Sequence, residues 1–116
     1  MEIEVRSMQQ IQLIKLRGKL SLGDPVDKLR ETLDGLMDRG DLDFILDLAE
    51  VPIVDSSGIG LLVRSFTALK QRGGRLKLLS PSRMTQQTLK MIGLINLFEV
   101  FDDQTKAVES FSETTS

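Results

Sequence analysis

The stretch from Phe44 to Gly60, FILDLAEVPIVDSSGIG, decides the fold of this 116-residue chain. It opens with the dense apolar run FILDL, which is typical of a strand that is covered on both faces of a sheet. Pro52 interrupts the connection that follows, and from Ile59 to Leu69 apolar residues recur at helical spacing. The stretch therefore predicts a strand, a short connection and a helix, which is the repeating unit of an α/β fold.

Two short strands and a helix are predicted before this unit. Ile3 and Val5 alternate with charged residues, and a second apolar-rich segment follows at 11–17 after a polar turn. This pattern predicts an antiparallel hairpin at the N-terminus. The oligomeric state is left open, with a weak homodimer as one option if an edge strand of the sheet is uncovered. Asp24 followed by Pro25 then predicts a helix start, with Asp24 as the N-cap residue.

Two further strands and two helices are predicted after the central unit. A strand at 76–79 is followed by Ser80 and Pro81, which repeat the cap-then-proline start of a helix. Another strand is expected at 97–101, and one of the two aspartates at 102–103 is expected to cap a last helix.

The predicted order of elements, ββαβαβαβα, defines the fold class. It implies an α/β protein with a mixed, mostly parallel sheet of four to five strands, an N-terminal β-hairpin and about four helices. We expect one domain over residues 1–111 and a polar C-terminal tail over residues 112–116.

The residue types that the chain lacks exclude much chemistry. It has no Cys, His, Trp or Tyr, so a Ser-His-Asp triad, a cysteine nucleophile and the usual zinc ligands are ruled out. Its net charge of −2 offers no electrostatic footprint for nucleic acid, and no apolar run reaches the length of a membrane span. These features predict a cytoplasmic protein that is not an enzyme and that uses no metal or cofactor.

Two sets of side chains are assigned structural roles. The first set is expected to fill the core, and consists of Met37, Met84 and Met91. The second set surrounds a Gly-Gly turn without aromatic neighbours for base stacking and is expected to form a solvated basic face: Lys70, Arg72, Arg75 and Lys77.

The segment Val54 to Gly60, VDSSGIG, is the candidate functional motif. It lies between a strand and a helix, where α/β sheets tend to meet ligands and partners. Asp55 or Ser56 can cap the helix, and a phosphate on Ser56 suits the partial positive charge of a helix N-terminus. The glycine spacing matches neither a Walker loop nor a GxGxxG cradle. A plain helix cap without further function is the alternative.

From about Ile3 to Asp103 the chain resembles the STAS domain of bacterial anti-sigma factor antagonists. The resemblance rests on the order and spacing of several segments along nearly the whole chain. These are Gly18 with Leu20, ILDL at 45–48, VDSSGIG at 54–60, GGRLKLL at 73–79, and IGL at 92–94 followed by FEVFDD.

This resemblance implies a binding module that frees a sigma factor by binding an anti-sigma factor, which is often a serine kinase. The implied phosphate acceptor is Ser56, and its phosphorylation releases the partner. The implied contact surface consists of Asp55, Ser57, Gly58 and Ile59, with Leu20, Ser21 and Leu22 beside them.

One segment departs from the pattern of this family. Many antagonists carry an acidic G-E-[IL]-D sequence after the second strand, whereas this chain carries Gly18-Lys19-Leu20-Ser21, which removes two negative charges. The alternative function is therefore a STAS adaptor or scaffold in a stress-signalling or lipid-transport complex, in which Ser56 is not phosphorylated.

Overall fold

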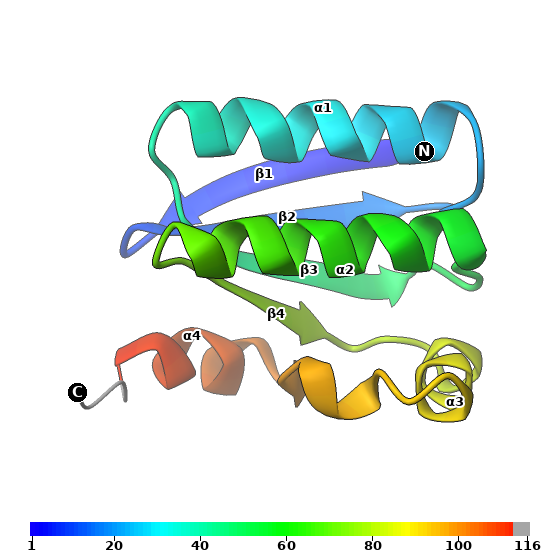
Figure 1. The fold of residues 1–116 in the computed structure, drawn as a ribbon. Coiled ribbons are helices and arrows are strands. Elements are labelled where there is room, and N and C mark those ends of the chain that lie inside the picture. Colours follow the sequence, from blue (N-terminus) through cyan, green and yellow to red (C-terminus); the bar gives the residue numbers. More distant parts are fainter. Residues whose placement is uncertain (113–116) are drawn as a thin grey trace.

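The computed structural model describes residues 1–112, and its five strands pair in the order β1-β2-β3-β4-β5 (Figure 1). The strands are β1 (Glu2–Met8), β2 (Ile11–Arg17), β3 (Asp43–Glu50), β4 (Arg75–Leu79) and β5 (Val100–Phe101). The helices are α1 (Asp24–Asp38), α2 (Ser56–Gln71), α3 (Arg83–Met91), the short 3-10 turn η1 (Ile95–Leu97) and α4 (Gln104–Ser112). The predicted α/β fold with a mixed sheet is confirmed.

The N-terminal hairpin sets one edge of the sheet. Strand β1 is antiparallel to β2, and the remaining neighbours, β2 to β5, pair in parallel. Gln9 and Gln10, the two residues of the turn, have φ angles of 53° and 67°. Positive φ at both central residues is the conformation of a type I′ turn, whose twist suits a tight hairpin.

Strand β3 is covered on both faces. On one face lie α1 and α2, side by side (Figure 1), and between these helices and the sheet is the main core. Fully buried residues of this core include Ile14, Leu16, Leu29, Leu33, Leu46 and Leu62. On the other face Leu13 and Ile45 pack against Ala107 and Phe111 of α4, because successive residues of a strand point to opposite faces.

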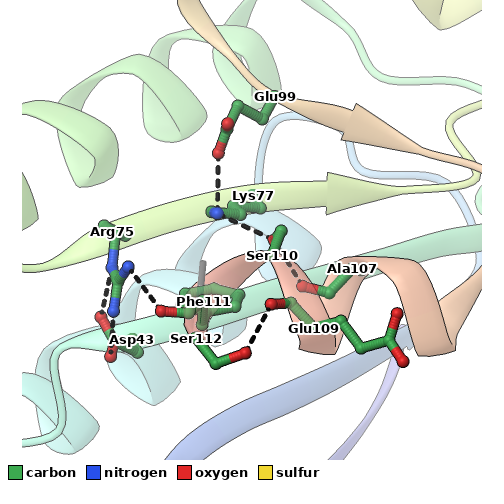
Figure 2. A network of polar contacts seen from close by, with 9 residues as sticks. All are labelled: Asp43, Arg75, Lys77, Glu99, Ala107, Glu109, Ser110, Phe111 and Ser112. Atoms are coloured by element: carbon green, nitrogen blue, oxygen red, sulfur yellow. Dashed lines mark hydrogen bonds and ion pairs between the residues drawn. The ribbon is translucent and has the colours of Figure 1, made fainter. Parts of the chain in front are cut away.

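Lys77 of β4 fastens α4 to this second face (Figure 2). Its Nζ donates to Ser110 Oγ at 2.8 Å and pairs with Glu99 at 2.8 Å. It also lies 4.3 Å from the centre of the Phe111 ring, within reach of a cation–π attraction. The buried ammonium group of Lys77 thus has all of these contacts with residues of the C-terminal part of the fold.

Arg75, two residues earlier on β4, holds the end of the same helix. It pairs with Asp43 at 3.0 Å and donates to the carbonyl of Phe111 at 3.1 Å (Figure 2). The predicted solvated basic face is therefore wrong for the half-buried Arg75 and the buried Lys77, because α4 folds back over them. The prediction holds for the two remaining members of the set, Lys70 and Arg72, which are exposed.

Two predicted helix starts are displaced by special backbone conformations. The N-cap of α1 is Gly23, with φ 106°, so Asp24 is the first helical residue rather than the cap. Ser80 has a φ of 53° and its N–H donates to the carbonyl of Phe101, so it ends the β4–β5 pairing. The cap of α3 is Ser82, whose Oγ accepts from Thr85 N–H at 3.0 Å.

Two predictions for the C-terminal third are also corrected. The strand expected at 97–101 is only two residues long, since Leu97 N–H bonds to the Leu94 carbonyl within a 3-10 turn. Met84 and Met91 are 58% and 86% exposed and do not fill the core, whereas Met37 is buried as expected. Helix α3 contributes its buried contacts through Thr85 and Leu89 instead.

Helix α4 begins after the cap residue Asp103 and ends at Ser112, inside the predicted tail. Asp103 Oδ1 accepts from Lys106 N–H at 3.2 Å, so Asp103 caps α4 as the sequence suggests. Ser112, expected as the first tail residue, is the last residue of α4. The rest of the expected tail, residues 113–116, lies outside the described residues.

Phe111→Ala tests whether α4 is an integral part of the fold. Removing this buried ring opens a void against the second face of the sheet, so the free energy of unfolding is expected to fall by about 3 kcal/mol in urea denaturation. Met91→Ala, at a position that is 86% exposed, is the control and is expected to change stability by less than about 0.5 kcal/mol. Equal effects of the two substitutions would contradict the assignment.

Candidate functional site

The VDSSGIG motif lies where the carboxyl end of β3 leads into α2. Beyond the end of β3, Val54 forms a single parallel bridge with Leu20, and Leu20 N–H donates to the carbonyl of Ile53 at 3.0 Å. The segment after β2 and the segment after β3 therefore run side by side just before α2 begins. Parallel strands bring their carboxyl ends to the same edge of a sheet, which is why these two connections meet.

Asp55 ties the two connections together through its side chain. One carboxylate oxygen accepts from Gly58 N–H at 2.9 Å and caps α2, while the other accepts from Leu22 N–H at 2.9 Å. The backbone N–H of Asp55 donates in turn to the Leu20 carbonyl at 3.1 Å. The donors from Gly58 and then Leu22 stabilise the ionised form, which lowers the pKa of Asp55 below its ordinary value.

Gly58 permits the close approach of these segments. A Cβ atom at this position would lie 2.7 Å from the Leu20 carbonyl oxygen and 2.7 Å from Val54 Cγ1. Carbon atoms do not lie that close to a backbone oxygen. Any side chain at position 58 would therefore push the connection between β2 and α1, residues 18–23, away from α2. Gly60, two residues later, has open space around it.

Ser56 is the first residue of α2 and its side chain is exposed. Its neighbour Ser57 is half-buried, and Gly58 is buried against the 18–23 connection. Of the two serines in the motif, Ser56 is thus the more accessible to another protein. Asp55, and not Ser56, is the N-cap, which decides between the two candidates that the sequence left open.

The structure brings all the predicted contact residues into one neighbourhood but does not expose them equally. Leu22 is 76% exposed, and Ser21 and Ser57 are half-buried. Leu20 and Ile59 are buried and support the surface from below.

Sequence reasoning missed two exposed apolar residues near the motif. The first is Ile53, which lies directly before the motif. The second is Met84 of α3: Ser82 Oγ donates to the Pro52 carbonyl at 3.3 Å and so places the start of α3 beside the connection between β3 and α2. The sequence does not predict that these Ile and Met side chains are exposed, because their sequence pattern is the same as that of core residues. Their exposure is known only from the structure.

A hollow of about 300 Å³ lies between α1 and α2, beside Ser57. Apolar side chains and two arginines line it: Leu22, Val26, Leu61, Arg30 and Arg64. Arg30 also pairs with Asp27 at 2.9 Å. No spacing in the sequence links the two arginines, because they come together only when α1 and α2 pack on the same face.

Two features of other classes of protein are absent from residues 1–112. No group of three or more acidic side chains comes together there as a possible metal site. No helix in the same range has the length and apolar character to cross a bilayer.

The chain belongs to the STAS domain family, whose family model matches residues 2–107. A curated relative, the anti-sigma F factor antagonist of Paenibacillus polymyxa, is 24% identical over 109 residues, which cover 93% of this chain and 92% of that protein. The anti-sigma-B factor antagonist of Staphylococcus aureus is 29% identical over 100 residues, covering 86% of this chain and 92% of the relative.

Solved structures of the same family share the fold. The phosphorylated form of the Bacillus cell fate determinant SpoIIAA superposes with a TM-score of 0.77 at 21% identity, covering 95% of this chain and 99% of that one. Its unphosphorylated form gives a TM-score of 0.76 at 20% identity, covering 97% of this chain and all of the other. These likenesses confirm the predicted STAS fold.

Gly58→Ala and Gly60→Ala form a matched pair that tests the close approach. The first places a methyl group against the Leu20 carbonyl and is expected to lower the free energy of unfolding by about 2 kcal/mol. The second lies in a helix with open space and is expected to raise it by about 0.5 kcal/mol. Urea denaturation of both variants measures the difference, and a stabilising Gly58→Ala would contradict the described geometry.

Asp55→Asn tests the contribution of the carboxylate charge. Because the folded pKa of Asp55 is lowered, its ionised form stabilises the fold above the unfolded pKa of about 4, and this effect is lost as the pH falls through the folded pKa. The variant is therefore expected to melt below the wild type at pH 7, with a difference that shrinks as the pH approaches 3. Thermal melts over this range provide the measurement. A difference independent of pH would show that the charge is not its source.

Proposed function

We propose that this protein is an anti-sigma factor antagonist that binds an anti-sigma factor and is released from it when Ser56 is phosphorylated. The observation that carries the proposal is the exposed Ser56 hydroxyl at the start of α2, next to the ionised Asp55. The curated relatives named as anti-sigma F and anti-sigma-B factor antagonists, matched along most of their lengths, support the same role.

The position of Ser56 suits a modification that leaves the fold intact. Its side chain faces solvent, whereas the capping bonds of α2 are made by Asp55. A phosphate at a helix N-terminus meets the partial positive charge of the helix and raises no packing conflict. The phosphorylated chain is therefore expected to keep its structure and to change only its surface.

The change in surface charge is large enough to switch binding. A phosphate adds about −1.5 to −2 charges beside the Asp55 carboxylate. When a partner covers this surface, a phosphate that loses its water or faces another negative charge makes the binding free energy less favourable by several kcal/mol. A cost of about 3 kcal/mol weakens binding more than a hundredfold. No movement of the backbone is required.

The contact surface in this proposal centres on Ser56 and combines the polar motif with exposed apolar residues. Leu22, Ile53 and Met84 offer the side chains that a partner can cover with a gain from apolar burial. Lys19 is exposed where many family members carry glutamate, so we expect the partner to present complementary charge at this point.

The same proposal assigns separate roles to this chain and to its partner. The chain contributes an acceptor hydroxyl and a binding surface, and a serine kinase, either the anti-sigma factor itself or an associated protein, supplies the catalysis. The encounter takes place in the cytoplasm and involves neither nucleic acid nor a membrane.

Ser56→Asp, Ser56→Ala and wild type together test the switch. We expect the wild type and Ser56→Ala to capture an anti-sigma factor from a lysate of the native host, and Ser56→Asp to bind the purified partner more than about a hundredfold more weakly. Calorimetry gives the affinities, and mass spectrometry of the native protein locates the phosphate. Thr67→Asp adds the same charge at an exposed position about 16 Å along α2 and is expected to bind like the wild type.

The alternative adaptor function gives a different result. If Ser56 carries no phosphate in the host and Ser56→Asp retains the captured partners, the phospho-switch is wrong and a scaffold function is favoured. Capture of transporter subunits in place of an anti-sigma factor points the same way.

A further inference from the structure

The outer edge of β1 is unpaired within residues 1–112. The strand occupies one end of the sheet and runs for seven residues, Glu2–Met8, with only β2 beside it. An edge of this length presents a row of unpaired N–H and C=O groups that another strand can use. At the opposite end of the sheet β5 has two residues, so β1 is the long edge.

The hairpin geometry determines which backbone groups point outward. Met8 and Ile11 flank the two-residue turn and form its hydrogen-bonded closing pair, after which bonded and non-bonded pairs alternate along the ladder. Ile3, Val5 and Ser7 are therefore non-bonded to β2, and their N–H and C=O groups face the open edge.

The side chains of β1 divide between the two faces of the sheet. Ile3 packs against the core under α1 and α2, whereas Met8 packs against the cluster under α4. Alternation along the strand places Val5 on the same face as Ile3, and Glu4 and Arg6 on the same face as Met8. Val5 is 39% exposed.

Only one antiparallel register of β1 with a second copy satisfies these constraints. When Val5 lies opposite Val5 of the second copy, Ile3 lies opposite Ser7, so all three outward-facing residues exchange hydrogen bonds. In this register Glu4 lies opposite Arg6 in both directions. A shift of two residues uses fewer outward groups and places Glu4 opposite Glu4 or Arg6 opposite Arg6.

From this match of hydrogen bonding and charge we infer that the chain forms a weak antiparallel homodimer through β1. The two sheets join into one, with the α1 and α2 layers of both copies on the same face. A single pair of edge strands buries less surface than stable dimers do, so the association is reversible and appears at high protein concentration.

The dimer leaves the proposed phosphorylation sites open. Because the two β1 strands are antiparallel, the β2 strands of the two copies also run in opposite directions. The motif lies near the carboxyl end of β2, so the two Ser56 side chains lie at opposite ends of the joined sheet. The inference is thus independent of the proposed function.

Charge reversal at the edge tests the dimer and its register. Glu4→Arg and Arg6→Glu each place like charges opposite one another twice, and each is expected to weaken self-association at least about tenfold. An equimolar mixture of the two variants restores both opposite-charge pairs and is expected to associate as the wild type does. Sedimentation equilibrium up to about 1 mM protein measures all four samples, with circular dichroism to check folding.

Val5→Pro is the second variant. It removes an N–H group that points away from β2, so the hairpin keeps its own hydrogen bonds while the dimer loses its central pair. We expect a folded monomer. A wild type that stays monomeric at about 1 mM overturns the inference, as do single variants that associate like the wild type or a mixture that fails to associate.

Discussion

The two hydrogen bonds accepted by the Asp55 carboxylate hold together the surface on which the proposed function depends. One bond ends on Gly58 at the start of α2 and the other on Leu22, 33 residues away along the chain. Each is a short bond from a backbone N–H to an ionised oxygen, the stronger kind of protein hydrogen bond. The Asp55 side chain thus links the connection after β2 to the start of α2, and it does so alongside the backbone bonds that join Leu20 to Ile53 and to Asp55.

The rest of the fold supports this arrangement from below. Parallel pairing of β2 with β3 brings the two connections to the same edge, and the buried Leu20 anchors the first of them beneath α2. Gly58 allows the contact because it has no side chain. On the opposite face, Arg75 and Lys77 hold α4 against the strands, so β3 is enclosed on both sides. The site is therefore a feature of the surface of a closed core and not of a cavity.

Local patterns predicted much of this structure. The hairpin, the β3–α2 unit and a cap at Asp55 or Ser56 follow from alternation, helical spacing and residue preferences over a few neighbours. Contacts between distant segments were not predictable, including the bond from Leu22 to Asp55 and the engagement of Lys77 by Ser110. The sequence pattern places Met84 in the core although it is 58% exposed, because hydrophobicity alone does not tell which face of a short helix packs against a neighbour.

The anchoring of Leu22 has a consequence for the kinetics of recognition. Because its backbone is already bonded to Asp55 in the free protein, a partner meets an ordered surface and does not have to fold a loop as it docks. Encounter rates of such rigid surfaces vary little between related complexes, and differences in affinity appear in the lifetime of the complex. Under the proposed function, weaker binding after phosphorylation is therefore expected to appear mainly as a shorter lifetime of the complex.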